Sequence, residues 1–245
     1  MTLLAPAVRR TVATGECSGP AVVLLHGFAS RGDLDWPDAA WAEPFAASGR
    51  DVLVVDLPGH GDAARPLGAP APTSAVIAAL ADLARAEGEI DLVGYSLGAR
   101  LAWDLAQAPG VRVRRLVLGG LSPVEPFGMV DVAAARTAVA TGSPVDDPLT
   151  GMITAMATAP GNDPTALLEI VEGFASEPFD PDAGAPAVPT LMIAGVDDPM
   201  AQGVDDLAVR IADESVVLLE RVPGDHVAAL HSPELRAAVQ RFLAG

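Results

Sequence analysis

The ten residues from Asp91 to Arg100, DLVGYSLGAR, constrain the fold of this chain more than any other stretch. A short apolar run over 90–93 ends in two glycines that flank a serine, and a helical spacing of apolar residues follows. This order predicts a strand, a very sharp turn and a helix, with Ser96 in strained backbone at the crest of the turn. Side chains at Gly94 and Gly98 would collide with the neighbouring chain, which explains both glycines. The turn therefore presents the serine hydroxyl beside the free N–H groups of a helix N-terminus.

Continuous apolar runs of strand length alternate with segments of helix length along most of the chain. Such runs are typical of strands that are buried on both faces of a parallel sheet. Strands are predicted over 21–25, 51–55, 90–93, 113–118, 189–194 and 215–219, with an edge strand within 7–14. Helices are predicted after Ser96 and over 38–47, 73–87, 201–212 and 233–243. Thr73 or Ser74 is expected to cap the 73–87 helix. The fold class is therefore α/β, with helices on both faces of a mostly parallel sheet.

The alternation stops between residues 121 and 187. No buried strand is expected there, and three helices are predicted near 129–140, 149–158 and 164–175, the last beginning at an Asp163–Pro164 pair. The predicted organisation is a core of residues 1–120 and 188–245 with a helical insertion at 121–187. We refer to this insertion as the cap segment.

Length and composition exclude several classes of protein. The 245 residues suit one α/β domain, and no run of about 18 apolar residues could span a bilayer. The N-terminus has its arginines after its short apolar stretch, the wrong order for a secretory signal, so we expect a cytoplasmic protein. Cys17 is the only cysteine, which excludes an internal disulfide and a thiolate cluster.

The net charge of −17 bears on the possible partners. An acidic surface repels nucleic acid and anionic membrane, so we expect neither as a partner. The carboxylates and histidines show no metal-ligand spacing, and no metal or other cofactor is predicted. The expected partner is a small-molecule substrate, and the expected assembly is a monomer or a homodimer.

With these motifs in view, the chain from Ala21 to Gly245 resembles the α/β-hydrolases. The order of nucleophile, acid and histidine in that superfamily matches Ser96, Asp198 and His226. The resemblance implies that His226 takes the proton of the serine and that the carboxylate fixes the tautomer of the imidazole. It also implies the α/β-hydrolase fold with a helical cap.

Two other carboxylates compete with Asp198 for the role of the acid. Asp197 is its neighbour in the same loop, but relatives place the acid three residues after the glycine that ends this strand, which favours Asp198. Glu125, after the preceding strand, corresponds to a position used in some relatives. Asp198 is the acid that we predict.

The resemblance also assigns roles to the remaining histidines and to two backbone N–H groups. His26 is expected to have a structural ring in the pair that shapes the oxyanion loop, and His60 is expected to hold loops together. His231 is expected to be a surface or helix-capping residue. The N–H groups of Phe28 and Leu97 are expected to form an oxyanion hole, which would bind the charge of a tetrahedral intermediate.

The reaction has to be inferred from the pocket, because this fold hosts many activities. The cap segment holds several methionines and phenylalanines, and Arg136 is its only cation against ten acidic residues. This composition favours an uncharged, fairly hydrophobic acyl substrate, and the function predicted is carboxylic-ester hydrolysis through an acyl-enzyme. The candidate pocket residues are His26, Tyr95, Arg100, Phe127, Met129, Met152 and Met156.

Other activities of the same superfamily stay open. The His26–Phe28 and Gly94–Gly98 motifs together with Arg100 are similar to the pyruvate-eliminating synthases of menaquinone biosynthesis, which hold substrate carboxylates with arginines. Ala99 stands where that family usually has glycine, and the cap segment offers only Arg136. A carbon–carbon-bond hydrolase, a cofactor-free perhydrolase and a non-enzymatic ligand receptor are further alternatives.

Overall fold

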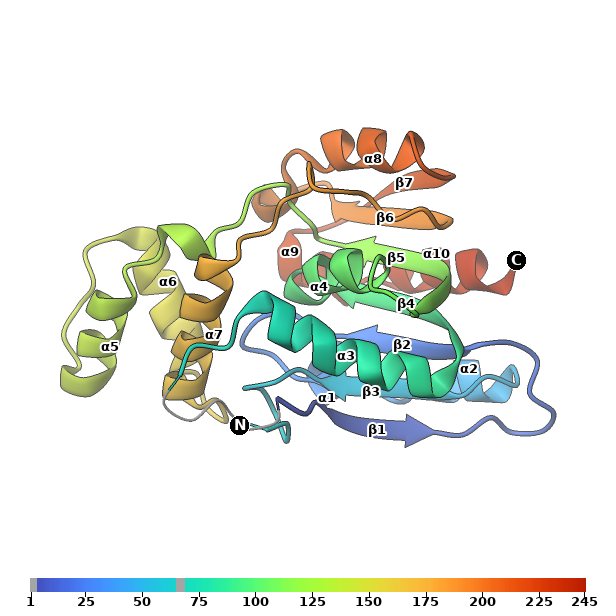
Figure 1. The fold of residues 1–245 in the computed structure, drawn as a ribbon, viewed down its shortest axis with the longest axis horizontal. Coiled ribbons are helices and arrows are strands. Elements are labelled where there is room, and N and C mark those ends of the chain that lie inside the picture. The colour runs from blue at the N-terminus through green and yellow to red at the C-terminus, as the bar shows by residue number, and fades with distance from the viewer. Residues whose placement is uncertain (1–3, 65–68) are drawn as a thin grey trace.

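A seven-stranded sheet forms the centre of the computed structural model, which describes residues 4–64 and 69–245 (Figure 1). Residues 1–3 and 65–68, which belong to the predicted core, lie outside the described residues. The strands occur in the order β1-β3-β2-β4-β5-β6-β7. Their bounds are β1 Ala7–Thr11, β2 Ala21–Leu25, β3 Val52–Asp56, β4 Glu89–Tyr95, β5 Arg112–Gly119, β6 Thr190–Gly195 and β7 Val217–Val222.

Strands β2 to β7 are parallel, and β1 pairs antiparallel with β3 at one edge. The predicted runs of apolar residues therefore do form a mostly parallel sheet. Parallel strands deliver the loops that follow them to one edge of the sheet, which is where ligands bind in open α/β sheets. The register places Gly94 of β4 between Leu25 of β2 and Leu118 of β5, so the loops after these three strands begin side by side.

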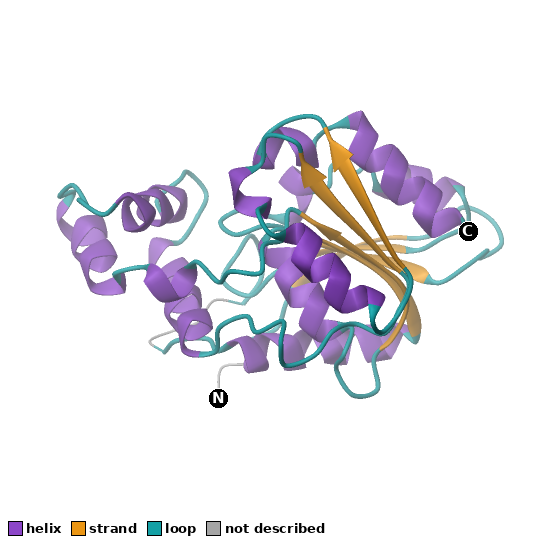
Figure 2. Ribbon diagram, turned by 90° about the horizontal axis from the view of Figure 1, so that it is seen from above, coloured by secondary structure: helices purple, strands orange, loops and turns teal. Residues whose placement is uncertain are grey.

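Helices cover both faces of the sheet (Figure 2). Alternate residues of strands β2 to β7 enter one of two apolar clusters, because successive side chains of a strand point to opposite faces. One face packs against α3 (Thr73–Glu87), α4 (Leu97–Leu105) and α8 (Val204–Ala212). The other packs against α2 (Ala42–Ala47), α9 (His226–Leu230) and α10 (Pro233–Ala244). No helix within 4–64 and 69–245 is long and apolar enough to cross a bilayer.

The cap segment connects β5 to β6 and consists of helices. Its elements are the 3₁₀ turn η1 (Phe127–Met129) and the helices α5 (Val132–Thr141), α6 (Pro148–Ala157) and α7 (Pro164–Ser176). These three helices lie together beyond the end of the sheet toward which β2 and β5 point (Figure 1). Each begins at an aspartate whose carboxylate accepts backbone N–H groups of the first turn, and Asp163 does so as predicted.

Two short helices differ from the predicted elements. Helix α1 (Gly32–Asp35) follows β2, where no helix is expected, and α9 begins at His226 in a segment expected to be a loop. Five residues or fewer carry too little apolar periodicity to be recognised. The carboxylate of Asp225 accepts the N–H groups of Val227 and Ala228, and it fixes the start of α9.

The prediction that Thr73 or Ser74 caps α3 is wrong. The backbone N–H of Ser74 donates to Glu177 Oε2 at 2.7 Å, and the Ser74 hydroxyl donates to Oε1 of the same carboxylate at 3.0 Å. The hydroxyl of Thr73 donates instead to the carbonyl of Glu177 at 2.9 Å. A carboxylate from the end of the cap segment therefore caps a helix of the core, where the helix dipole favours negative charge.

We expect Glu177→Ala to lower the free energy of unfolding by about 1 kcal/mol, the usual cost of a lost N-cap. Urea denaturation followed by circular dichroism measures the change. Glu172→Ala is the matched control, because Glu172 makes only a partly exposed ion pair with Arg136, and its loss should cost less than about 0.5 kcal/mol. Equal losses in the two variants would contradict the capping role.

Candidate active site

Ser96 occupies a strained turn between β4 and α4. Its backbone angles are φ 54° and ψ −117°, and Ala29 is the only other non-glycine residue with positive φ in the described ranges. A Cβ at Gly98 would overlap the carbonyl oxygen of Leu25, and one at Gly94 would overlap the carbonyl of Gly98. The two glycines thus permit the close approach that the sequence predicts. The backbone N–H of Ser96 donates to Gly119 O at 2.8 Å, which ties the turn to β5.

Asp198 and His226 come together from the loops after β6 and β7. Nδ1 of His226 lies 2.8 Å from Oδ2 of Asp198, whose side chain is fully buried. The other carboxylate oxygen accepts the N–H of Met200 at 2.8 Å. Because a carboxylate accepts, Nδ1 carries a proton, and in the neutral form of an imidazole so held Nε2 is the acceptor. Asp197 is exposed and makes no contact with the histidine ring.

Tyr95 fixes the backbone of His226. Its hydroxyl donates to the carbonyl of His226 at 2.6 Å, and the two ring centroids lie 5.2 Å apart. Burial raises the pKa of Tyr95, so the hydroxyl stays protonated and able to donate. A Cβ at Gly120 would come within 2.9 Å of both rings. Tyr95 is predicted to line a substrate pocket, but it is buried beneath the site as a support for the histidine.

Two backbone N–H groups near Ser96 have no acceptor among the described residues. Leu97 is the first residue of α4, and the first N–H groups of a helix lack partners within it. The other belongs to Phe28, in the turn after β2. The carbonyl of Gly27, on the same peptide unit as the Phe28 N–H, accepts from His26 Nδ1 at 2.7 Å and from Ser30 N at 3.3 Å. Because the peptide is planar and trans, holding this carbonyl aims the N–H in the opposite direction.

His26 is a structural residue. The prediction that it lines a substrate pocket is wrong. The ring is fully buried, Nδ1 donates to Gly27 O, and Nε2 accepts the N–H of Leu57 at 3.0 Å. Burial lowers its pKa, so the ring is neutral in the tautomer that these two bonds require. His60 packs edge-on against it with 5.1 Å between centroids, and burial lowers the pKa of His60 to about 3. Both rings hold loops together, as expected.

Asp35 is a site residue that sequence reasoning missed. Its buried carboxylate accepts the N–H of Gly27 at 2.8 Å through Oδ2 and the hydroxyl of Ser30 through Oδ1. It therefore holds both ends of the turn that carries the Phe28 N–H. A Cβ at Gly27 would lie 3.5 Å from the Cβ of Ser96, which shows how closely this turn approaches the serine. No local pattern distinguishes Asp35 from Asp33, which is exposed and pairs with Arg31.

The geometry agrees with what comparison with known proteins finds. Residues 22–239 match the family described as "Alpha/beta hydrolase family". The chain belongs to this family. Among curated proteins, no match is found.

Solved structures of other proteins share the fold at low sequence identity. A hydrolase from Pseudomonas aeruginosa is 24% identical with a TM-score of 0.72, and the alignment covers 98% of this chain and 94% of that one. A thermophilic esterase from Thermogutta terrifontis is 21% identical with a TM-score of 0.74, covering 98% and 93%. MenH from S. aureus is also 21% identical with a TM-score of 0.74, covering 97% of each chain. Identities this low show the fold alone.

In this α/β-hydrolase, Arg100 does not point into a substrate pocket but forms a buried ion pair with Glu125. Nε of Arg100 lies 2.5 Å from Oε2 of Glu125, and both side chains are at least nine-tenths buried. A second guanidinium nitrogen donates to Thr73 Oγ1 at 3.0 Å and to Glu177 O at 2.9 Å. The ring of Phe174 packs against the guanidinium at 4.6 Å from its centroid. Glu125, the remote candidate for the acid, is thus the partner of Arg100.

The other predicted pocket residues separate into two groups. Phe127 is buried, with its ring 5.1 Å from that of Phe28, and Met156 is partly buried against the main apolar cluster. Met129 and Met152 are exposed by 61% and 41%, so neither is part of an enclosed apolar lining. Helical spacing of apolar residues does not reveal which of them meets the core when the helices are this short.

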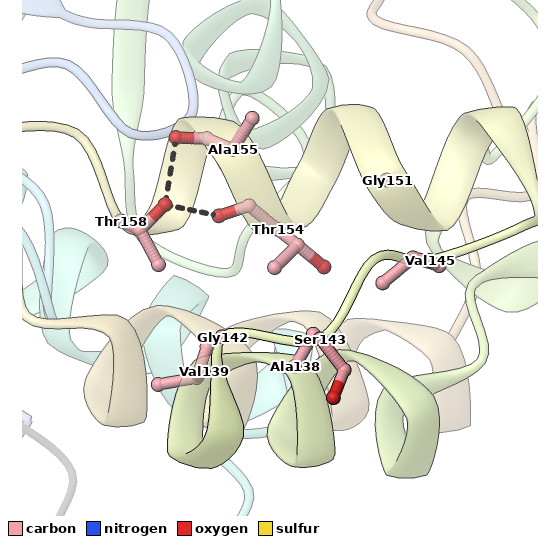
Figure 3. A pocket seen from close by; sticks show the side chains of 9 residues that line it. All are labelled: Ala138, Val139, Gly142, Ser143, Val145, Gly151, Thr154, Ala155 and Thr158. Atoms are coloured by element: carbon pink, nitrogen blue, oxygen red, sulfur yellow. Dashed lines mark hydrogen bonds between the residues drawn. The ribbon is translucent and has the colours of Figure 1, made fainter.

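Two surface cavities lie elsewhere. The larger, of about 370 Å³, is a groove between α5 and α6 that is lined mainly by small residues (Figure 3). In this groove the hydroxyl of Thr158 donates to Thr154 O and Ala155 O, so its hydrogen-bonding capacity is satisfied by carbonyls of α6. The smaller, of about 210 Å³, lies between Trp41 and Arg236 beside the exposed His231. Neither cavity borders Ser96.

Arg100→Ala should lower the free energy of unfolding by about 3 kcal/mol, because it leaves the buried carboxylate of Glu125 without its cation. Urea denaturation measures this loss. Arg136→Ala, which breaks an exposed ion pair within the cap segment, should cost less than about 0.5 kcal/mol. Adding Glu125→Gln to Arg100→Ala should recover part of the loss, and a double variant less stable than Arg100→Ala would contradict the explanation.

Proposed function

We propose that the protein is a serine hydrolase that cleaves carboxylic esters through an acyl-enzyme, with Ser96 as nucleophile, His226 as base and Asp198 as the acid that orients the base. The observation that carries the proposal is the 2.8 Å contact between His226 Nδ1 and the buried Asp198. It leaves Nε2 as an acceptor, on a histidine that Tyr95 also holds next to the Ser96 turn. Membership of the alpha/beta hydrolase family supports a hydrolase.

The first half of the proposed reaction acylates the serine. Nε2 of His226 takes the hydroxyl proton of Ser96 as Oγ attacks the ester carbonyl carbon. The carbonyl oxygen becomes an oxyanion and is bound by the N–H groups of Leu97 and Phe28, and each such donor is worth about 3 kcal/mol in the transition state. The tetrahedral intermediate then expels the alcohol, which receives the proton from Nε2. Asp198 stabilises the imidazolium while it exists.

The second half hydrolyses the acyl-enzyme with the same groups. Water attacks the acyl carbon and gives a proton to Nε2, and the second oxyanion occupies the same two N–H groups. The bond between the acyl carbon and Ser96 Oγ then breaks, and Oγ recovers its proton from His226. This step releases the carboxylic acid. The strained backbone of Ser96 supports both halves, since it keeps Oγ at the crest of the turn.

An uncharged substrate with an apolar part fits the surroundings best. The chain carries a net charge of −17, and Asp35, Asp197 and Asp225 accompany Asp198 at this edge of the sheet, so an anionic substrate would be repelled. Large apolar side chains are exposed on the segments after β2, β5, β6 and β7: Leu34, Val124, Met129, Val196, Met200 and Val227. These can contact an apolar substrate at the edge where Ser96 lies.

The contacts of Arg100 favour the esterase over the pyruvate-eliminating synthase. A synthase of this kind needs a cation that is free to bind substrate carboxylates, whereas this guanidinium is held by Glu125 and by the carbonyl of Glu177. Arg136, the other cation of the cap segment, is paired with Glu172. The synthase is therefore an outcome for the experiment to test, as are the carbon–carbon-bond hydrolase, the perhydrolase and the receptor.

A panel of p-nitrophenyl esters from acetate to decanoate, with the menaquinone precursor beside it, tests the reaction. We expect ester turnover and covalent labelling by a fluorophosphonate, and Ser96→Ala should abolish the labelling and lower kcat by about 10⁴-fold or more. Pyruvate release without ester turnover would identify a synthase, and binding without turnover a receptor. Labelling of Ser96→Ala at full stoichiometry would refute the nucleophile.

Two neighbouring aspartates allow a matched test of the acid. Asp198→Asn keeps the shape of the side chain but removes the charge that selects the tautomer of His226, so kcat should fall by about 10⁴-fold. Asp197→Asn should change kcat less than about threefold, because Asp197 is exposed and does not contact the ring. Steady-state kinetics at neutral pH on folded variants decides the matter. An active Asp198→Asn enzyme would overturn this assignment.

A further inference from the structure

Among the described residues, the cap segment makes one hydrogen bond to the turn that carries the Phe28 N–H, and it does so through a side-chain amide. Nδ2 of Asn162 donates to the carbonyl of Ala29 at 2.9 Å and to the carbonyl of Met156 at 3.0 Å. Asn162 lies in the connection between α6 and α7, where its backbone N–H donates to Ala159 O at 3.1 Å. Both hydrogens of the amide are thus used, one on its own segment and one on the core.

The backbone at Ala29 needs such a partner. Its φ of 56° lies in the left-handed region, which costs a residue with a Cβ about 1 kcal/mol or more. Strained backbone of this kind persists where the surrounding structure determines it. Asp35 holds the turn on the core side through Gly27 N and the Ser30 hydroxyl. On the other side, Asn162 holds the carbonyl of the strained residue itself.

Two peptide units in series connect Asn162 to the Phe28 N–H. The Ala29 carbonyl that accepts from Asn162 shares a planar peptide with Ser30 N, which donates to Gly27 O at 3.3 Å. Gly27 O in turn shares its peptide with the N–H of Phe28. Hydrogen bonds in such a chain polarise and orient one another. A contact made by the cap segment therefore reaches the N–H that faces the oxyanion.

From this chain of contacts we infer that Asn162 is a positioning residue for the oxyanion-binding N–H of Phe28. Through it, the geometry of the oxyanion hole depends on the position of the cap segment against the core. The inference rests on the proposed function. It adds a residue 66 positions after Ser96 to the machinery of the same reaction. A carboxylate at this position could not fill the role, because it would place negative charge against two carbonyl oxygens.

The test compares Asn162→Ala and Asn162→Asp with Thr158→Ala. Thr158 lies in the same connection, but its hydroxyl bonds only to carbonyls of α6. Removing one oxyanion donor costs about 10²–10³-fold in kcat, so misdirecting one should lower kcat by about tenfold in Asn162→Ala, with KM within about twofold. Asn162→Asp should lose at least as much, and Thr158→Ala should keep the wild-type kcat.

Two further readouts distinguish positioning from general destabilisation. A trifluoromethyl ketone adds Ser96 Oγ to its carbonyl carbon and leaves an oxyanion in the hole, so its Ki should rise in Asn162→Ala by the factor that kcat/KM falls. Amide hydrogen exchange in a peptide covering residues 27–31 should accelerate in Asn162→Ala and not in Thr158→Ala.

Suppose that a fluorophosphonate still labels Asn162→Ala and that its kcat and its Ki for the ketone are unchanged. This result would overturn the inference and leave the proposed function standing. A lower Tm with wild-type kcat at a temperature where the variant is folded would also overturn it. A wild-type protein that neither hydrolyses esters nor is labelled at Ser96 would refute the proposed function, and the inference would fall with it. A tenfold loss of kcat without a change in KM, together with an equal rise in the Ki of the ketone, supports the inference.

Discussion

The close approach of α4 to the end of β2 is the contact on which the candidate site depends. Gly98 lies so near the carbonyls of Leu25 and His26 that no side chain fits between them. This approach brings the first turn of α4, with the free N–H of Leu97, against the segment that continues from β2 into the Phe28 turn. The same contact forces the chain to reverse at Ser96, and the φ of 54° follows. One steric constraint thus sets the nucleophile turn and both candidate oxyanion donors.

Buried carboxylates hold the segments around that contact. Asp35 binds the Phe28 turn, Asp198 binds His226, and Glu125 binds Arg100 together with the N–H of Phe127. Burying an ionised carboxylate is costly unless hydrogen bonds or a cation compensate it. Each of the three has such partners; Asp198 and Glu125 join segments that follow different strands, and Asp35 closes the segment after β2 on itself. These carboxylates therefore fix loops that have few apolar residues with which to pack, and they do so where the position of a loop decides the chemistry.

Sequence patterns revealed the strands and the serine turn because both are local. The apolar runs at 21–25 and 51–55 and the Gly94–Gly98 spacing carry their structure within a few residues. Family resemblance then led to Asp198 and His226, which the fold brings together across 28 positions. Asn162 and the Glu177 cap were missed because each acts on a distant segment, and nothing nearby in sequence marks the partner. Asp35 was missed although its partners are near in sequence, because no local pattern distinguishes it from Asp33. Met129 and Met152 were misplaced for a related reason, since spacing alone did not show which side of a short helix meets the core.

Three polar contacts between the cap segment and the core bear on the candidate site, and they differ in strength. At its start Glu125 forms the buried ion pair with Arg100, and at its end Glu177 caps α3 and accepts from Arg100 through its carbonyl. These two contacts share Arg100, and the Arg100–Glu125 pair is buried, so breaking that pair is expensive. The middle contact, from Asn162 to Ala29, is one neutral hydrogen bond between partly exposed groups, worth about 1 kcal/mol. Of the three, the Asn162 contact is therefore the easiest to break, and its loss would release the carbonyl of Ala29 in the turn that carries the Phe28 N–H.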